Sequence, residues 1–155
     1  MIKRNNVAII RSARTDDIPQ MCGLLADLFL IEADFATDAE KQARGLTLLL
    51  EDQSGRSCVV VAVREGAVVG MCSVQTVIST AEGGPSGLVE DLVVRRELRG
   101  RGIGRALLDH VLTWCKGQGL SRVQLLADKG NAPALAFYTS RGWDVTSLIC
   151  LRKRH

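Results

Sequence analysis

The stretch that decides the fold is EDLVVRRELRGRGIGR, residues 90–105. It indicates a strand, a short connection, and three glycines that alternate with arginine and isoleucine where a helix begins. Glycine lets a backbone approach a ligand closely, and the unpaired N–H groups of a helix N-terminus bind phosphate. Arg99, Arg101 and Arg105 add charge-assisted donors. The stretch predicts a site for a pyrophosphate-bearing cofactor, while a plain structural turn remains the alternative.

Three kinds of phosphate-binding turn compete for this stretch. A P-loop requires Lys and then Ser or Thr after its glycines, but Gly104 is followed by Arg and Ala. A dinucleotide fold requires a glycine where Leu107 stands and an acid after the next strand, for which Asp128 is a loose candidate. The Arg-x-x-Gly-x-Gly turn that binds coenzyme A fits residues 99–104 without a gap. The spacing therefore favours coenzyme A.

A second motif lies further along the chain, where NAPALAFY occupies residues 131–138 and Gly-Trp follows at 142–143. Residues 88–108 resemble the acetyl-CoA motif of the GNAT superfamily of N-acetyltransferases, and the second motif resembles that family's Asn-x-x-Ala-x-x-x-Tyr…Gly-Phe/Trp pattern. Two motifs in the right order are more specific than either alone. The resemblance implies an acetyl-CoA-dependent N-acetyltransferase in which the amine attacks the thioester directly, without an acyl-enzyme.

The sequence predicts a single α/β domain over residues 1–155, with the element order βααβββαβαββ and a mixed central sheet flanked by helices. Apolar residues at helical spacing indicate the helices, and short apolar runs between turn residues indicate the strands. This order matches the GNAT fold, and residues 83–87 are expected to form a loop. The expected strands are 7–12, 58–65, 67–80, 88–94, 122–127, 143–145 and 148–152, and the expected helices are 18–33, 38–50, 105–116 and 131–142.

The resemblance also implies which residues bind the cofactor. Strand 88–94 would splay from its parallel neighbour, so that the pantetheine arm pairs with backbone groups of Leu92 and Val94. A backbone N–H near Leu92 or Val93 would polarise the acetyl carbonyl, although these residues are equally typical of a buried strand. The residues expected at the cofactor are Leu92, Val93, Val94, Arg99, Gly100, Arg101, Gly102, Ile103, Gly104, Arg105, Asn131, Ala134 and Tyr138.

Glu90 is the candidate general base. An aliphatic ammonium has a pKa near ~10 and must lose a proton before it attacks, which a carboxylate can accept directly or through a water. Glu90 and Asp91 are neighbours on a strand, so their side chains are expected on opposite faces. Glu90 matches the position used in the polyamine-type branch of the family. The alternative is that both carboxylates are solvated or paired with arginines.

Tyr138, the only tyrosine in the chain, is the candidate general acid. A phenol stays protonated at neutral pH and can donate to a departing thiolate. Asn131, Ala134, Leu135 and Tyr138 share one helical stripe, which would face the cofactor. The alternatives are a half-buried core tyrosine and, for Asn131, a helix cap.

The acceptor is expected to be an amine, with a cationic small molecule as one candidate. The resemblance implies that the first two helices and the loop before strand 88–94 form the wall of the acceptor site. Residues 27–52 carry seven acidic and two basic side chains, which suits a polyamine, an aminoglycoside or a protein lysine as acceptor. A solvated acidic helix face is the competing interpretation.

Composition excludes several classes of protein. Of the 155 residues, 46% are hydrophobic and 24% are charged, which is typical of a globular domain, and no apolar run is long enough to cross a membrane. The five cysteines are scattered and only two histidines occur, so we expect no metal site and a cytoplasmic protein. The basic C-terminal half leaves a nucleic-acid-binding module as an alternative, although aromatic residues are only 4% of the chain. A non-catalytic acyl-CoA sensor is another alternative, and the family makes a homodimer an expectation.

Overall fold

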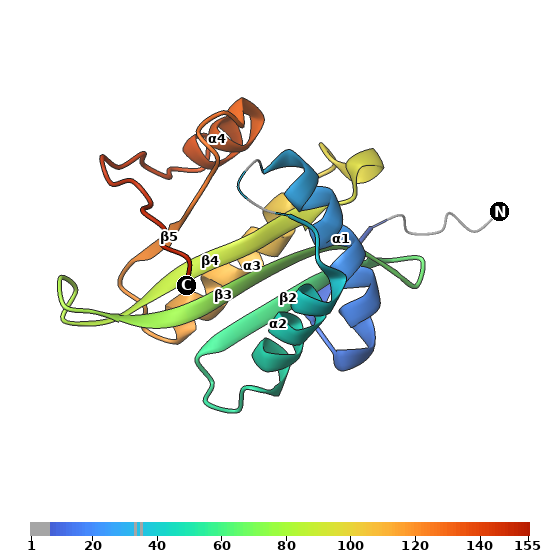
Figure 1. Ribbon diagram of the computed structural model, residues 1–155, viewed down its shortest axis with the longest axis horizontal. Coiled ribbons are helices and arrows are strands. Elements are labelled where there is room, and N and C mark those ends of the chain that lie inside the picture. The colour runs from blue at the N-terminus through green and yellow to red at the C-terminus, as the bar shows by residue number, and fades with distance from the viewer. Residues whose placement is uncertain (1–6, 33, 35) are drawn as a thin grey trace. The chain divides into compact units, whose positions relative to one another are not determined.

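The computed structural model describes residues 7–32, 34 and 36–155 and divides into two compact units after Gln124 (Figure 1). The strands are β1 (Ile9–Ser12), β2 (Ser57–Arg64), β3 (Ala67–Ser79), β4 (Gly84–Val94) and β5 (Val123–Leu125), and the α-helices are α1 (Ile18–Ile31), α2 (Ala39–Glu51), α3 (Ile103–Gly117) and α4 (Ala132–Thr139). The first unit therefore contains β1 to β4 with α1 to α3, and α4 belongs to the second unit.

The strands form one sheet in the order β1-β2-β3-β4-β5. The pairs β1–β2, β2–β3 and β3–β4 are antiparallel. Strands β4 and β5 are neighbours joined through α3, which is the crossover connection that parallel strands require. A two-residue turn links β2 to β3, and both of its residues, Glu65 and Gly66, have the positive φ that such hairpins need. The mixed sheet flanked by helices confirms the predicted fold class.

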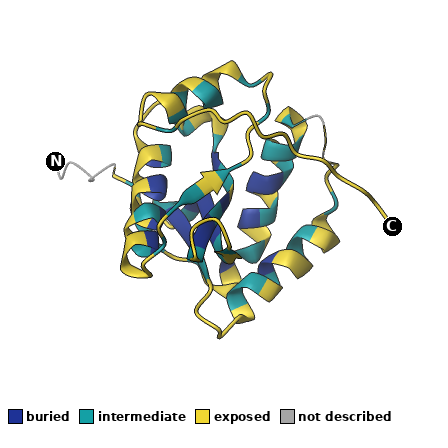
Figure 2. Cartoon of the chain, turned by 90° about the vertical axis from the view of Figure 1, so that its left-hand side faces the viewer, coloured by how far each residue is buried: buried dark blue, intermediate teal, exposed yellow. Residues whose placement is uncertain are grey.

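Helices cover both faces of this sheet, and the buried residues lie between the sheet and the helices (Figure 2). On one face, α1 and α2 pack on apolar residues of β2, β3 and β4. On the other face α3 approaches closely, because a Cβ built on Gly70 would stand 2.9 Å from Leu107 Cδ1. The cluster on the α1–α2 face consists of Met21, Leu24, Leu25, Leu46, Val59, Val61, Val68, Met71 and Val93.

The predicted helices form with small shifts at their ends. Asp38 caps α2, and its Oδ1 accepts a hydrogen bond of 3.1 Å from the N–H of Lys41. Helix α3 begins at Ile103, two residues earlier than predicted, because the left-handed Gly102 already acts as its N-cap. Over the described residues, no helix combines the length and the apolarity that crossing a bilayer would demand.

The predicted secondary structure is wrong in two places. Residues 84–87, expected in a loop, are the start of β4, because each pairs with a residue of β3 despite the glycines and proline. The strands predicted over 143–145 and 148–152 do not form. Leu148, Ile149 and Leu151 are 83%, 80% and 86% exposed, so their apolar pattern has no neighbouring strand or core to pack against.

A bidentate ion pair fixes the start of α1 against β1. Arg11 Nη1 and Nη2 donate to the two carboxylate oxygens of Asp17 at 2.7 and 2.9 Å, and the N–H of Arg14 donates to Asp17 Oδ2 at 2.7 Å. Asp17 is buried and Arg11 is partly exposed. Hydrogen bonding from Arg11 holds the pKa of Asp17 below its ordinary value.

Replacing this carboxylate is expected to destabilise the fold in a pH-dependent way. At pH 7, Asp17→Asn should lower the free energy of unfolding by about 2 kcal/mol, because a charged hydrogen-bonded pair is lost. The lowered pKa makes this contribution complete above the unfolded pKa of about 3.9, and it disappears as pH falls through the folded pKa. Urea unfolding at pH 7 and pH 3 measures it, with the exposed Asp16→Asn as control. A constant difference between the two pH values would contradict the assignment.

Candidate functional site

The glycine-rich turn at the start of α3 has the geometry of an anion site. Gly100 and Gly102 have φ values of +73° and +82°, and Gly102 is the N-cap residue of α3. The first hydrogen bond of the helix runs from the N–H of Ala106 to the Gly102 carbonyl at 3.0 Å, so the N–H groups of residues 103–105 have no partner within the helix. A Cβ on Gly102 would meet no protein atom within 4 Å, and the space over the turn is open to a ligand.

The three arginines of the turn differ in their roles. The Nε of Arg99 donates to the carbonyl of Val94 at 2.9 Å, which ties the turn to the end of β4. Arg105 is an exposed partner of Asp109 at 3.5 Å, a surface pair of little stabilising value. The exposed guanidinium of Arg101 makes no hydrogen bond or ion pair within the described chain. Arg101 and the remaining donors of Arg99 are thus available to an anionic ligand.

Strand β4 pairs with β3 along one edge, and β5 covers its other edge only in part. Val93 pairs with Met71 of β3, and the N–H of Arg95 donates to the Val69 carbonyl at 2.8 Å. On the other edge, the N–H of Gly87 donates to the carbonyl of Arg122 at 2.8 Å, where β5 is about to begin. A three-residue strand spans only about 10 Å, so β5 does not extend to the end of β4. Among the described residues, the N–H of Val94 on this edge is left for another partner.

A β-bulge interrupts β4 at the predicted catalytic position. The pairing passes from Ser73 with Glu90 to Met71 with Val93, so Asp91 and Leu92 together lie opposite the single residue 72. Asp91 has a φ of +55°. The strict alternation that would place Glu90 and Asp91 on opposite faces is therefore interrupted here. The residue types along β4 gave no signal of this bulge.

The two adjacent carboxylates have different environments. Glu90 is exposed, and its backbone carbonyl accepts a hydrogen bond of 3.2 Å from Ser73 Oγ. Asp91 is half-buried, and its pKa is raised to about 6, first by desolvation and then by the negative charges of Glu90 and Glu32. Glu32 directly follows α1, so the end of that helix contributes to the field at Asp91.

The second unit holds the residues of the second motif. Asn131 caps α4, and its Oδ1 accepts from the N–H of Ala134 at 3.2 Å, which confirms the cap interpretation. Tyr138 is half-buried and packs edge-on against Phe137 and Trp143, with ring centroids 5.2 and 5.6 Å apart. The carbonyl of Tyr138 also accepts from the N–H of Trp143 at 3.2 Å. The four residues of the predicted stripe do share a face: they are half-buried, unlike most other residues of α4.

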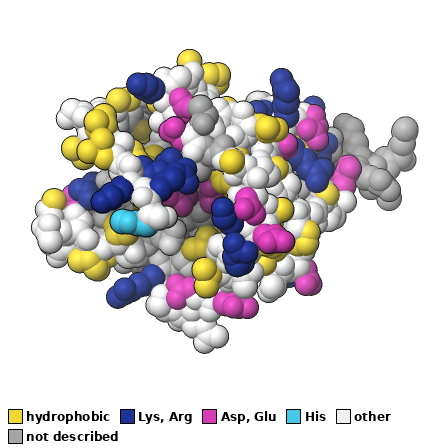
Figure 3. Space-filling view, in the orientation of Figure 1, with side chains coloured by type: hydrophobic (Ala, Val, Ile, Leu, Met, Phe, Trp, Pro, Cys, Tyr) yellow, Lys and Arg dark blue, Asp and Glu magenta, His cyan; other side chains and the backbone are white. Residues whose placement is uncertain are grey.

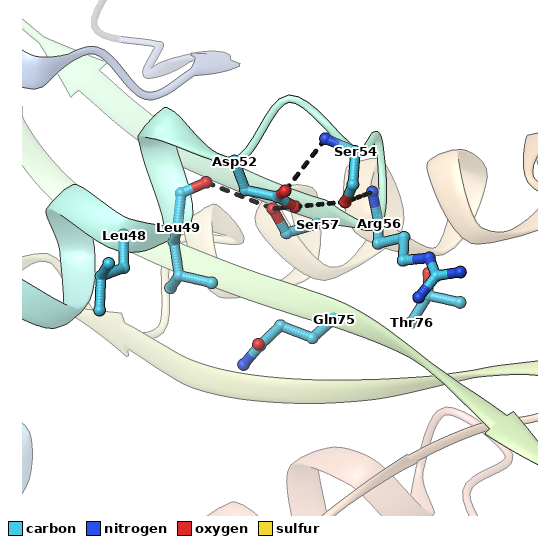
Figure 4. Close-up of a pocket in the computed structure, with 8 residues that line it drawn as sticks. All are labelled: Leu48, Leu49, Asp52, Ser54, Arg56, Ser57, Gln75 and Thr76. Carbon is cyan, nitrogen blue, oxygen red and sulfur yellow. Dashed lines mark hydrogen bonds between the residues drawn. The ribbon is translucent and has the colours of Figure 1, made fainter.

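A hollow of about 400 Å³ lies between the end of α2, the start of β2, and β3 (Figure 4). Its lining is Leu48, Leu49, Asp52, Ser54, Arg56, Ser57, Gln75 and Thr76. The carboxylate of Asp52 accepts from the N–H of Ser54 at 3.0 Å and from its hydroxyl at 2.8 Å, and the first of these bonds lowers the pKa of Asp52. The sequence did not predict this hollow, because its lining comes from two separate segments, residues 48–57 and 75–76.

The hollow and Glu90 share one face of the sheet. Residues paired across antiparallel strands share a face, and Ser73 pairs with Glu90. Gln75 lies two residues further along β3. That is a distance of about 7 Å and returns to the same face.

Among the residues that the structure describes, no three His, Cys, Asp or Glu side chains gather as metal ligands.

Comparison with known proteins identifies the family of the chain. The sequence profile of the acetyltransferase (GNAT) family matches residues 20–143, which include the glycine-rich turn, the bulge and Tyr138. The chain belongs to the acetyltransferase (GNAT) family. This assignment confirms the resemblance that the two motifs indicate.

The chain is also similar to one curated N-acetyltransferase and to several solved structures. An uncharacterized N-acetyltransferase, ycf52-like, from Prochlorococcus marinus is 38% identical over 53 residues, which are 34% of this chain and only 28% of that protein's length. A transcriptional regulator from Bacillus halodurans C-125 has a crystal structure that is 26% identical, with a TM-score of 0.82 over 96% of this chain and 99% of that one. A possible acetyltransferase from Clostridium difficile 630 shares the fold at 21% identity, with a TM-score of 0.81 over 96% and 98% of the two chains. Acetyl transfer is therefore the general activity of the family to which this chain belongs.

Proposed function

We propose that this GNAT protein transfers the acetyl group of acetyl-CoA directly to a primary amine. The observation that carries the proposal is the turn at Gly102, where free helix N–H groups and open space meet at the end of a half-covered strand. A phosphate group suits the free N–H groups, and an extended pantetheine arm suits the half-covered edge of the strand. The unpaired guanidinium of Arg101 supplies positive charge beside them.

The residues proposed to hold acetyl-CoA follow from these features. The backbone of residues 99–105 would bind the pyrophosphate, and residues 92–94 would pair with the pantetheine arm. The carbonyl of Val94 already accepts from Arg99, so the free group of Val94 on this edge is its N–H. A backbone N–H near Leu92 would polarise the acetyl carbonyl, whereas Val93, expected as an equal candidate, pairs with Met71 and directs its N–H to β3. Asn131 would contribute the amide nitrogen that its capping role leaves free.

The proposed chemistry needs a base and an acid. Glu90 removes a proton from the acceptor ammonium, directly or through a water, and the neutral amine then attacks the thioester carbonyl. The C–N bond forms, the C–S bond breaks, and the thiolate takes a proton from the Tyr138 hydroxyl. The nitrogen loses its second proton as the amide forms, so one proton in all is released for each acetyl group transferred. No residue forms a covalent intermediate.

A cationic amine is the proposed class of acceptor. The end of α1 carries Glu32, whose charge acts on Asp91 beside Glu90, and Asp34 follows it. Both acids lie in the segment 27–52, which is strongly acidic. An ammonium group entering this region would be attracted by several carboxylates before it reached the acetyl group.

Reversing these charges is expected to weaken acceptor binding. The double variant Glu32→Lys, Asp34→Lys should raise the KM for a cationic amine about tenfold or more, since two attractive charges become repulsive. Steady-state kinetics at low salt measure the change. The variant Asp16→Lys, Glu65→Lys, which alters the net charge equally outside the segment 27–52, should keep the wild-type KM. Equal KM values in both double variants would place the acceptor elsewhere.

The first test of the function is calorimetric titration with acetyl-CoA, with ATP and NAD as controls. Selective micromolar binding is expected, followed by release of free CoA thiol when a panel of primary amines is added. Well-folded protein that fails to bind acetyl-CoA would refute the proposal. Binding without turnover on any amine would favour the alternative of an acyl-CoA sensor.

A further inference from the structure

Asp91 occupies an uncommon backbone conformation inside a strand. Its φ of +55° falls in the left-handed region, which side-chain-bearing residues rarely adopt and which Asp and Asn tolerate best. Glycine would adopt it without cost. The bulge that produces this conformation places Asp91 and Leu92 opposite one residue of β3. Bulges of this kind re-aim side chains, and strained residues gather at functional sites.

The carboxylate of Asp91 also has no partner. It accepts no hydrogen bond and forms no ion pair within the described residues, although it is half-buried. The charged and titratable groups that act on it are Glu90 on its own strand, Glu32 at the end of α1 and the buried thiol of Cys72 on β3. Burial raises the pKa of Cys72 well above its ordinary value, so that thiol stays neutral. Among the described residues, no positive charge offsets the two glutamates at this position.

We infer that Asp91 is a second proton-binding carboxyl of the acetyl-transfer site, so that the Glu90–Asp91 pair, and not Glu90 alone, takes the proton of the acceptor ammonium. The inference rests on the proposed function. The ammonium gives one proton to the pair and becomes a neutral amine, and the pair changes from two negative charges to one. After transfer the pair returns that proton to solvent. Two neighbouring carboxyls that interact bind protons as a unit.

This arrangement favours catalysis near neutral pH. A carboxylate of ordinary pKa is a weak base toward an ammonium, whereas desolvation and the two glutamates raise the pKa of Asp91 to about 6. An incoming ammonium would supply the missing positive charge next to an unpaired carboxylate. Below about pH 6 Asp91 is already protonated and no longer takes a proton from the ammonium. The rate should therefore rise with pH through about 6.

The test is the pH profile of kcat in the wild type and in Asp91→Asn. Asparagine keeps the shape of the side chain and also tolerates the left-handed conformation, so the bulge is expected to persist. At pH 7 the variant should lose about 10- to 100-fold in kcat. Its acid limb should shift below pH 6, because the variant lacks the carboxyl whose pKa is raised to about 6. The Kd for acetyl-CoA should stay unchanged, and thermal unfolding should show an intact fold.

The matched variant Glu90→Gln separates the two carboxyls. It should also lower kcat, but the Asp91 carboxyl should still titrate, which carbon-13 NMR of the aspartate carboxyls can follow without any substrate. An active wild type together with a wild-type kcat and an unmoved acid limb in Asp91→Asn would overturn the inference and leave the proposed function standing. A wild type that releases no thiol with any amine would overturn the proposed function and the inference with it.

Discussion

Gly102→Val is expected to abolish acetyl-CoA binding in a protein that still folds. Gly102 is the N-cap of α3, its φ is +82°, and no protein atom lies within 4 Å of the position that a Cβ would take. A valine side chain there would fill the open space over the free N–H groups of the helix. It would also strain the left-handed backbone by about 1–2 kcal/mol, which a domain of this size should tolerate.

The control for this variant is Gly66→Val in the hairpin between β2 and β3. Gly66 has nearly the same φ, +80°, and likewise has no protein atom near its absent Cβ, but it lies outside the proposed cofactor site. Both variants should lose similar stability in thermal unfolding. Only Gly102→Val should lose the calorimetric signal with acetyl-CoA. Tight binding by a folded Gly102→Val protein would remove this turn from the cofactor site.

Tyr138→Phe is expected to lower kcat about 100-fold and to leave the affinity for acetyl-CoA nearly unchanged. The phenol ring packs edge-on against Phe137 and Trp143, and phenylalanine keeps that packing. Only the hydroxyl is removed, and with it the proton that the proposed mechanism delivers to the thiolate. A large loss in kcat with a constant Kd is the signature of a group that acts mainly in the transition state.

Measuring kcat across the pH range separates this role from a structural one. Loss of a general acid should depress the rate most at high pH, where solvent protons are scarce. Phe137→Leu changes a neighbouring ring without touching the hydroxyl, so it should keep the wild-type pH profile. If Tyr138→Phe retained wild-type kcat at every pH, the tyrosine would have no part in proton transfer.

Much of the fold could be predicted from local patterns. The turn at 99–104 depends on glycines at fixed spacing, and the apolar stripes of α1 and α3 repeat at helical intervals, so residue type alone is informative there. The strands predicted at 143–145 and 148–152 do not form, because an apolar run alone does not make a strand. An apolar run becomes a strand only when a neighbour offers hydrogen bonds and a surface to pack on, and short-range sequence does not reveal that.

The residues of the candidate site could likewise be predicted only in part. Glu90 and Tyr138 could be proposed from their motifs, because their positions within a strand and a helix follow from spacing. The conformation of Asp91 could not be predicted from the sequence. A bulge depends on the register of two strands, and the residue types along β4 are ordinary for a strand. The hollow near Gln75 could not be predicted either, since residues 48–57 and β3 come together only in the folded chain.

The charge distribution shows a similar limit. The C-terminal part of the sequence is basic and the N-terminal part acidic, which suggested regions of opposite sign. On the face drawn in Figure 3, however, Lys and Arg side chains lie among Asp and Glu side chains. Charge along a chain therefore says little about charge across a surface once strands from distant segments become neighbours.

The half-covered edge of β4 also makes the exchange of its amide hydrogens uneven. The N–H of Arg95 is bonded to β3, so alternation along the strand directs the N–H of Val94 to the opposite edge, beyond the reach of β5. Protection from solvent deuterium should then differ between these adjacent residues of the same strand. A cofactor arm that completed the edge would slow exchange at Val94 and leave Arg95 as it was. If acetyl-CoA binds as proposed, the substrate itself completes the last hydrogen bonds of β4.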